Sequence, residues 1–186
     1  MMSAVFDSSV YGELVLDEPF LKELAKHVNV SFAVFGSETV EEELQNTSTG
    51  KKIKEGKFKG LNLRDFLTTL YRLFTRRSET LLKTDLVEIV AARYYVAYSK
   101  EAAKSGLAKR QSKLLNDFRI VASASLRGVG IIVTADKDTM LRSEAVSAYR
   151  LVNGAFQLET PELHSYADFK RRLPELLGKA EGDENE

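Results

Sequence analysis

The segment from Leu114 to Leu141 constrains the fold of this chain more than any other. Its first half repeats apolar and small residues at three- and four-residue spacing, at Phe118, Val121, Ala122 and Ser125. This spacing predicts a helix, and Gly128 and Gly130 suit its end and a tight connection. The apolar run Ile131–Val133 then has the composition of a strand buried on both faces. We therefore expect an α/β fold, with a central, mostly parallel sheet of about four to five strands flanked by helices.

Acidic residues stand at the ends of the expected elements. Asp7 ends a first strand predicted over residues 3–7, Asp117 opens the helix, and Asp136 and Asp138 follow the strand at 131–133. Ligands of open α/β sheets bind outside the carboxyl ends of the strands. Asp7 is the hardest to explain otherwise, because a charge at the end of a buried strand is costly without a partner.

Three short patches resemble the PIN-domain family. They are Ala4-Val5-Phe6-Asp7-Ser8-Ser9-Val10, the Glu43-Leu44 pair, and NDFRIVASAS followed by GIIVTADKDTML. The family places an Asp after its first strand, a Glu-Leu pair on a helix, an Asp at the start of a small-residue helix, and a Thr-x-Asp turn after a strand. The resemblance implies a metal-dependent nuclease, usually acting on RNA, with its acidic positions at Asp7, Glu43, Asp117 and Asp136.

The chemistry of the acidic residues also favours a cation. Crowded carboxylates raise one another's pKa unless a positive charge relieves them. The chain has no Cys, and oxygen-only ligands favour Mg²⁺ or Mn²⁺. The candidate metal ligands are Asp7, Glu43, Asp117, Asp136 and Asp138, with Ser9 and Thr134 as supporting hydroxyls. Ordinary structural roles remain open: a helix cap for Asp117, and turn formation for Asp136, Asp138, Ser9 and Thr134.

Helical phase separates the three adjacent glutamates of a helix predicted over residues 38–46. A helix turns by about 100° per residue. With Val40 and Leu44 inward, Glu43 lies nearest the inward face, Glu41 farther away, and Glu42 almost directly outward. We expect Glu43 to face the site.

Two basic clusters are candidate RNA contacts. One is the polar loop over residues 47–60, and the other lies at the end of a helix predicted over residues 61–77. Their members are Lys51, Lys52, Lys54, Lys57, Lys59, Arg72, Arg76 and Arg77. The alternative for the loop is a solvated connector. We interpret residues 61–105, with a second helix over 84–105, as an enlarged helical arm that serves as a dimer face or substrate platform.

The remaining elements complete one domain over residues 1–177. We expect helices over 18–28 and 142–152, a strand over 30–35, an edge strand over 155–158, and a last helix over 166–177 that is interrupted or ends near Pro174. An acidic tail over 178–186 is predicted to be disordered. The net charge of +0 excludes a global field toward nucleic acid. Without a membrane-length apolar run or a secretory signal, we expect a cytoplasmic protein that does not bind membranes.

Two functions compete. The first is a PIN-type ribonuclease, either a toxin with an antitoxin partner or a housekeeping RNA-processing enzyme, expected to form a homodimer. The second is a catalytically silent PIN-like module that binds RNA or protein. Asp136-Lys137-Asp138 also resembles the Asp-x-Asp of haloacid-dehalogenase-type phosphatases, but it falls too late in the chain for that fold.

Overall fold

A five-stranded parallel sheet forms the centre of the protein. The computed structural model describes residues 2–75, 79–104 and 114–182, with side chains as far as Gly178. The strands run in the order β3-β2-β1-β4-β5. They are β1 (Met2–Phe6), β2 (Phe32–Ser37), β3 (Thr80–Leu81), β4 (Ile131–Thr134) and β5 (Glu162–Ser165). The predicted α/β fold with a parallel sheet is confirmed.

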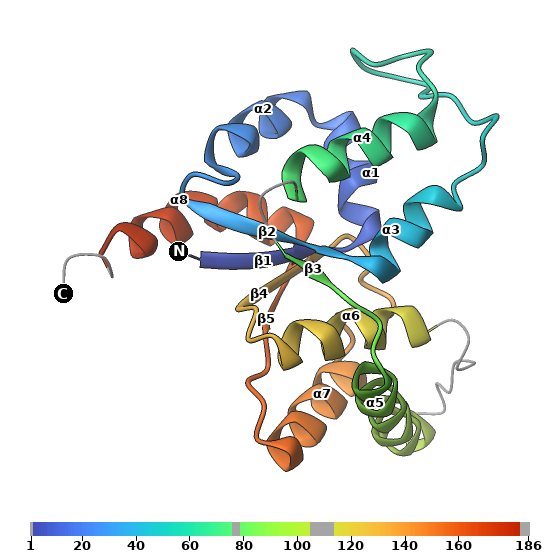
Figure 1. Cartoon of the computed structure of the whole chain (residues 1–186), viewed down its shortest axis with the longest axis vertical. Helices are drawn as coiled ribbons and strands as arrows, with labels where there is room; N and C mark the ends of the chain where they lie inside the picture. The colour runs from blue at the N-terminus through green and yellow to red at the C-terminus, as the bar shows by residue number, and fades with distance from the viewer. Residues whose placement is uncertain (1, 76–78, 105–113, 183–186) are drawn as a thin grey trace.

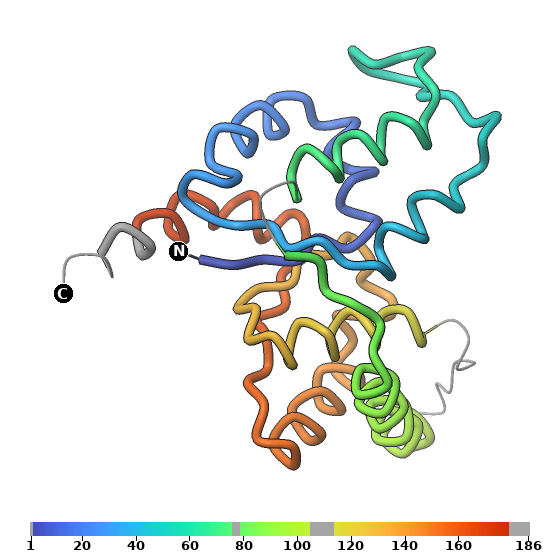
Figure 2. The backbone as a smooth tube through the Cα atoms, viewed as in Figure 1, coloured from blue at the N-terminus to red at the C-terminus, as the bar shows by residue number. Residues whose placement is uncertain are grey.

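Helices cover both faces of the sheet. In chain order they are α1 (Ser8–Leu16), α2 (Glu18–His27), α3 (Glu38–Gln45), α4 (Leu63–Thr75), α5 (Asp85–Lys104), α6 (Leu115–Leu126), α7 (Ser143–Phe156) and α8 (Tyr166–Gly182). One layer holds α1, α2, α4 and α8, and the other holds α5, α6 and α7 (Figure 1). The trace passes from the first layer to the second after β3 and returns at α8 (Figure 2).

The strand order creates a switch point between β1 and β4. The chain places β2 and β3 on one side of β1, then crosses back to add β4 and β5 on the other side. Adjacent strands on opposite sides of such a reversal leave a crevice at their carboxyl ends, where ligands of open α/β sheets bind. Asp7 follows β1 directly, and Thr134 ends β4, so both lie at this crevice.

Aromatic side chains fill the core of both layers. Phe169 of α8 packs edge-to-face against Phe6 at 5.5 Å between ring centroids and against Phe32 at 6.3 Å. In the second layer, Tyr149 packs against Tyr94 and Phe118 at 5.1 and 5.8 Å. Such edge contacts favour a fixed arrangement beyond simple burial, so the elements that carry the acidic residues sit on a rigid base.

Several predicted elements need correction. The chain forms α1 and the short strand β3, which were not predicted. The edge strand predicted at 155–158 is wrong, because Ala155 and Phe156 continue α7 and Gln157 ends it with a left-handed conformation at φ 56°. The edge strand is β5 instead. Helix α8 passes through Pro174 and reaches Gly182, within the segment predicted to be disordered; residues 183–186 lie outside the described part.

The region interpreted as a helical arm is part of the two layers. Helix α4 covers one face of the sheet, and α5 packs against α6 and α7 on the other (Figure 1). At the start of α5, Leu86 and Ile89 are 49% and 52% exposed, and Val87 is buried. Tyr94 and Tyr98 are fully buried in the core. No helix in the described ranges is long and apolar enough to span a membrane.

Candidate functional site

Asp7 is fixed at the end of β1 by hydroxyl groups. Its carboxylate Oδ2 accepts hydrogen bonds from Ser9 Oγ at 2.5 Å and from Thr134 Oγ1 at 2.9 Å. Its backbone N–H donates to the carbonyl of Val133 at 2.9 Å, which joins the ends of β1 and β4. The side chain is only 5% exposed. The hydroxyls of Ser9 and Thr134 therefore set the orientation of a buried carboxylate.

Asp136 is held by the backbone of its own turn. Its Oδ1 accepts from the N–H groups of Asp138 at 2.7 Å and Thr139 at 3.2 Å, and its own N–H donates to Thr134 Oγ1 at 3.0 Å. Asp residues form such turns readily. Thr134 thus connects Asp7 and Asp136. The side chain of Asp138 is exposed.

Glu43 reaches the same edge of the sheet from α3. Its Oε2 accepts from Ser8 Oγ and its Oε1 accepts from Asn116 Nδ2, both at 2.7 Å. Burial raises the pKa of Glu43; these two hydrogen bonds act against the rise, and the charge of Asp7 adds to it. Glu42 is exposed and forms an ion pair with Lys83. The structure therefore turns Glu43, and not Glu42, toward Asp7.

Asp117 lacks the hydrogen bonds that hold the other carboxylates. It lies in the first turn of α6 and is not its cap residue, which is Leu114. Its Oδ2 is buried without a hydrogen-bond partner, as is the Oγ1 of neighbouring Thr139. Burial, followed by the charges of Asp7, Asp136 and Glu43, raises the pKa of Asp117 to about 7, whereas Thr139 lowers it. We take Thr139 as an electrostatic neighbour, since no hydrogen bond of normal geometry joins them.

The effects of neighbouring charges on the pKa of Asp117 show that four carboxylates lie near one another. Asp7, Asp136 and Glu43 all act on Asp117, although they come from β1, the turn after β4, and α3. As the side chains stand, no three His, Asp or Glu residues in the described ranges are close enough together to hold a metal ion. The backbone thus gathers the four residues at the switch point, and their side chains remain spread around it.

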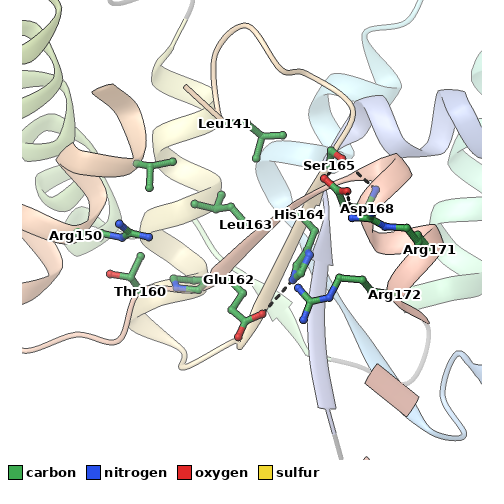
Figure 3. Close-up of a pocket in the computed structure, with 12 residues that line it drawn as sticks. Leu141, Arg150, Thr160, Glu162, Leu163, His164, Ser165, Asp168, Arg171 and Arg172 are labelled. Carbon is green, nitrogen blue, oxygen red and sulfur yellow. Dashed lines mark hydrogen bonds and ion pairs between the residues drawn. The ribbon is translucent and has the colours of Figure 1, made fainter. Parts of the chain in front are cut away.

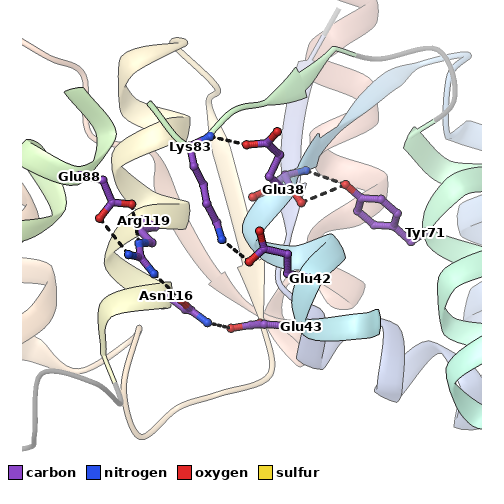
Figure 4. Close-up of polar contacts among 9 residues, drawn as sticks. Glu38, Glu42, Glu43, Tyr71, Lys83, Glu88, Asn116 and Arg119 are labelled. Carbon is purple, nitrogen blue, oxygen red and sulfur yellow. Dashed lines mark hydrogen bonds and ion pairs between the residues drawn. The ribbon is translucent and has the colours of Figure 1, made fainter. Parts of the chain in front are cut away.

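A polar relay connects Glu43 to α5. Arg119 donates from Nε and Nη2 to the two carboxylate oxygens of Glu88 at 2.8 and 3.0 Å, and from Nη1 to Asn116 Oδ1 at 3.2 Å. Asn116 in turn donates to Glu43 (Figure 4). This fixes the amide orientation of Asn116, because its oxygen faces a donor and its nitrogen faces a carboxylate. The relay spans α3, α6 and α5.

The basic residues predicted to bind RNA lie outside this cluster. Lys51, Lys52, Lys54, Lys57 and Lys59 are all exposed. Lys57 forms an ion pair with Glu18 at 3.0 Å, and Arg72 lies 3.9 Å from Glu41. Arg76 and Arg77 lie outside the described residues. The cation that acts on the site itself is Lys83, whose charge lowers the pKa of Glu43.

Sequence reasoning missed Ser8, Lys83, Asn116 and the Arg119–Glu88 pair. Ser8 was visible as part of the Asp-Ser-Ser run after the first strand. Asn116 precedes Asp117, but nothing in the sequence indicates that its amide meets a residue of α3. Glu88 and Arg119 lie on the two successive helices of the β3-to-β4 connection, 31 positions apart, so only the packing of α5 on α6 pairs them.

Comparisons with known proteins assign no family. No family model and no curated protein matches the chain. Among solved structures, the chain is similar to one in the crystal structure of VapBC2 from Rickettsia felis bound to a DNA fragment from their promoter, at 14% sequence identity and a TM-score of 0.47, covering 88% of this chain and 98% of that chain. A likeness at this level does not assign a function.

Proposed function

We propose that this chain is a Mg²⁺- or Mn²⁺-dependent endoribonuclease that hydrolyses RNA phosphodiester bonds. The observation that carries the proposal is the meeting of Asp7, Glu43, Asp117 and Asp136 at the switch point of the sheet. Carboxylates held together in this way repel one another, and burial makes the repulsion stronger. Their arrangement is costly for folding and is explained by a function that uses their charge.

The residues fit a hard divalent cation. Every candidate ligand offers oxygen, which Mg²⁺ and Mn²⁺ prefer. The buried Oδ2 of Asp117 has no hydrogen-bond partner, as expected of an atom that binds a ligand. A bound divalent cation supplies an activated water and stabilises charge that develops on the phosphodiester.

The protein's own groups divide the work around that cation. Ser9 and Thr134 orient Asp7, the turn backbone orients Asp136, and Asn116 with Ser8 orients Glu43. Asp117, whose pKa rises to about 7, is partly protonated near neutral pH, and a cation held by Asp7, Glu43, Asp117 and Asp136 would displace that proton. Asp7, Glu43 and Asp136 are already oriented by their hydrogen bonds.

The RNA backbone needs positive charge beyond the carboxylates. The exposed lysines from Lys51 to Lys59, together with Arg72, Arg76 and Arg77, are proposed to contact phosphates. Each such contact releases counterions and makes binding salt-dependent. Their exposure supports this role, since exposed cations remain accessible to a large polyanion.

Cleavage of a labelled single-stranded RNA by the purified chain tests the proposal. We expect activity with Mg²⁺ or Mn²⁺ and none in EDTA. The variant Asp136→Asn should be inactive, and Asp65→Asn on the exposed surface of α4 provides the matched control. Cleavage that persists equally in EDTA and in Asp136→Asn would identify a contaminating nuclease and reject the proposal.

The alternative function is a PIN-like module that binds RNA or protein without cleaving it. Crystals soaked in Mn²⁺ separate the two, because the anomalous signal locates manganese directly. A peak bounded by Asp7, Asp117 and Asp136 supports the nuclease. RNA binding without a peak and without cleavage supports the silent module.

The resemblance to PIN-domain proteins extends the proposal to a toxin paired with an antitoxin. Expression of the chain alone should then arrest growth, and the product of a small neighbouring gene should relieve it. Growth unaffected by the active enzyme would favour a housekeeping role in RNA processing.

A homodimer is also proposed, supported by the exposed apolar side chains Leu86, Ile89 and Val96 on α5, and light scattering in solution tests it.

A further inference from the structure

The outer edge of β5 is open. In the order β3-β2-β1-β4-β5, this strand is last and pairs with β4 alone among the described strands. Glu162 donates its N–H to the carbonyl of Gly130 at 2.8 Å, so its backbone faces β4. Residues alternate along a strand, and therefore the N–H and C=O of Leu163 and the N–H of Ser165 face away from the sheet. Such groups form a template for another strand.

A cavity of about 620 Å³ runs along this edge. Its floor is β5, and its walls come from α7 and α8. Figure 3 shows Arg150 of α7 on one side of Leu163 and His164, and Arg171 and Arg172 of α8 on the other side. The open edge thus has arginines on both of its flanks.

These arginines carry charge that the groove does not neutralise firmly. Arg150 has no ion pair within the described part of the chain. Arg171 pairs with Asp168 at 2.8 Å, but both side chains are more than half exposed, and exposed pairs contribute little. Arg172 lies 3.5 Å from Glu175, whose side chain is 54% exposed. Of the two acidic residues in the groove, Asp168 also accepts from Ser165 Oγ at 2.7 Å, and Glu162 lies 3.2 Å from His164. The groove is therefore biased toward a negatively charged ligand.

The arrangement selects an extended ligand over a compact anion. A single phosphate would require the arginines to converge, whereas β5 separates them. An extended peptide places successive side chains on opposite faces, so its acidic residues can meet Arg150 on one face and Arg171 and Arg172 on the other. A nucleic acid strand lacks the backbone N–H and C=O ladder that Leu163 and Ser165 match, and none of the residues that line the groove is a Phe, Tyr or Trp on which bases would stack.

We propose that the edge of β5 binds an extended acidic peptide segment of a partner protein as a sixth strand. The peptide backbone pairs with Leu163 and Ser165, and its carboxylates bind the guanidinium groups of Arg150, Arg171 and Arg172. Main-chain pairing supplies affinity in this mode of recognition, and the flanking side chains supply specificity. Arginine suits this role because its planar donors match carboxylates. The groove is separate from the carboxylate site, so the proposal stands independently of nuclease activity.

A fluorescent peptide of sequence Val-Glu-Glu-Val-Glu-Glu-Val tests the proposal, because it presents carboxylates on both faces of a strand. We expect saturable binding by fluorescence anisotropy, with NMR shifts at the amides of Leu163 and Ser165. The double variant Arg150→Glu/Arg172→Glu should weaken binding by roughly tenfold or more, since like charges then oppose the peptide. Arg127→Glu, an exposed arginine beside Glu79 near the opposite edge of the sheet, is the matched control and should bind normally.

A second probe isolates the strand pairing without altering the protein. The same peptide with alternate backbone nitrogens methylated keeps its carboxylates but cannot form the ladder, and it should lose binding. Equal binding of the methylated peptide would overturn the sixth-strand proposal in favour of charge attraction alone. Absence of peptide binding, or Arg150-dependent binding of single-stranded oligouridine in its place, would also overturn it.

Discussion

Within the candidate site, the carboxylates at the strand ends and the carboxylate on α6 differ in their hydrogen-bond partners. At the strand ends, Asp7 accepts two hydroxyl hydrogen bonds and Asp136 accepts two backbone N–H groups. On α6, Asp117 has a buried oxygen, Oδ2, that has no hydrogen-bond partner, and its pKa rises to about 7. The strand-end carboxylates are thus held in place before any ligand arrives, whereas Asp117 depends on a proton or a ligand.

The strand-end carboxylates are therefore fixed in orientation, whereas the carboxylate on α6 is unfavourable in its charged form. Hydrogen bonds to a carboxylate favour its charged form, and burial without them favours the neutral form. The charged form of Asp117 is therefore unfavourable in the folded protein. Binding of a cation would relieve more of this unfavourable electrostatic energy at Asp117 than at the strand-end carboxylates. The predictions below test this division, from the largest expected effect to the smallest.

Loss of a strand-end carboxylate should have the largest effect on activity. Asp7→Asn and Asp136→Asn each remove a charge that is already oriented, and we expect RNA cleavage in Mn²⁺ to fall by on the order of 10³-fold or more, since metal-assisted charge stabilisation is worth several kcal/mol. Steady-state cleavage rates measure this. Circular dichroism should show both variants folded, and near-normal activity in a folded variant would remove that residue from the site.

The stability of the metal-free protein should fall as pH rises from 5 to 8. The folded pKa of Asp117, about 7, lies above its ordinary value of 3.8. Between these values the folded state keeps a proton that the unfolded state has lost, so this stabilisation is full below pH 3.8 and disappears as pH rises through about 7. We expect a decrease on the order of 2 to 4 kcal/mol in urea unfolding. The raised pKa of Glu43 acts in the same direction.

The control for this pH dependence is Asp117→Asn, which cannot lose a proton. Its unfolding free energy should change less between pH 5 and 8, and it should exceed that of the parent chain at pH 8. Saturating Mn²⁺ should stabilise the parent at pH 8, by about 2.7 kcal/mol at a hundredfold excess over Kd, and stabilise the variant less. An identical pH slope in both proteins would show that Asp117 is not the group that titrates.

Disruption of the relay to Glu43 should have an intermediate effect. Asn116→Ala removes a hydrogen bond to Glu43, and Arg119→Ala releases the amide of Asn116; residues that orient metal ligands typically change metal affinity by about 10- to 100-fold. Mn²⁺ titration followed by electron paramagnetic resonance measures the affinity. In a Glu43→Gln background both substitutions should have little further effect, because their influence passes through Glu43.

Glu42→Gln is the matched control for Glu43→Gln. Glu42 is exposed, and its ion pair with Lys83 is of the kind that contributes little. We expect Glu43→Gln to impair cleavage strongly and Glu42→Gln to leave it nearly unchanged. Loss of activity in Glu42→Gln alone would mean that α3 presents a different face to the RNA.

Substitution of the loop lysines should have the smallest effect on the site and should leave cleavage chemistry intact. Replacing all five lysines from Lys51 to Lys59 with Gln should flatten the salt dependence of RNA binding by about 0.7 in log–log slope for each phosphate that the variant no longer neutralises. Filter binding at several salt concentrations measures the slope. An unchanged slope would assign the loop to the role of a solvated connector.

The sequence alone determined the parallel α/β fold and the chain positions of the acidic residues. Apolar runs such as Ile131–Val133 have few alternatives to a buried strand, and polar residues directly after them must lie at the sheet's edge. Local signals also located the end of α6, just before Gly128, and the start of α5, where Thr84 Oγ1 accepts from the N–H of Val87 at 3.3 Å. Periodicity and end signals are properties of adjacent residues, so they can be read without the fold.

Only the tertiary structure decided which side chains meet and which stay unpaired. The sequence placed an edge strand at 155–158, but the packing of α7 extended the helix through those residues and moved the edge to β5. Asp117 resembles a helix cap in the sequence, yet its Oδ2 is buried and lies near Tyr149 and Thr139, which come from other elements. Asn116 reaches Glu43 only because α6 lies beside α3. Burial, mutual repulsion and hydrogen-bond partners depend on distances between residues far apart in the chain, and these distances exist only in the folded protein.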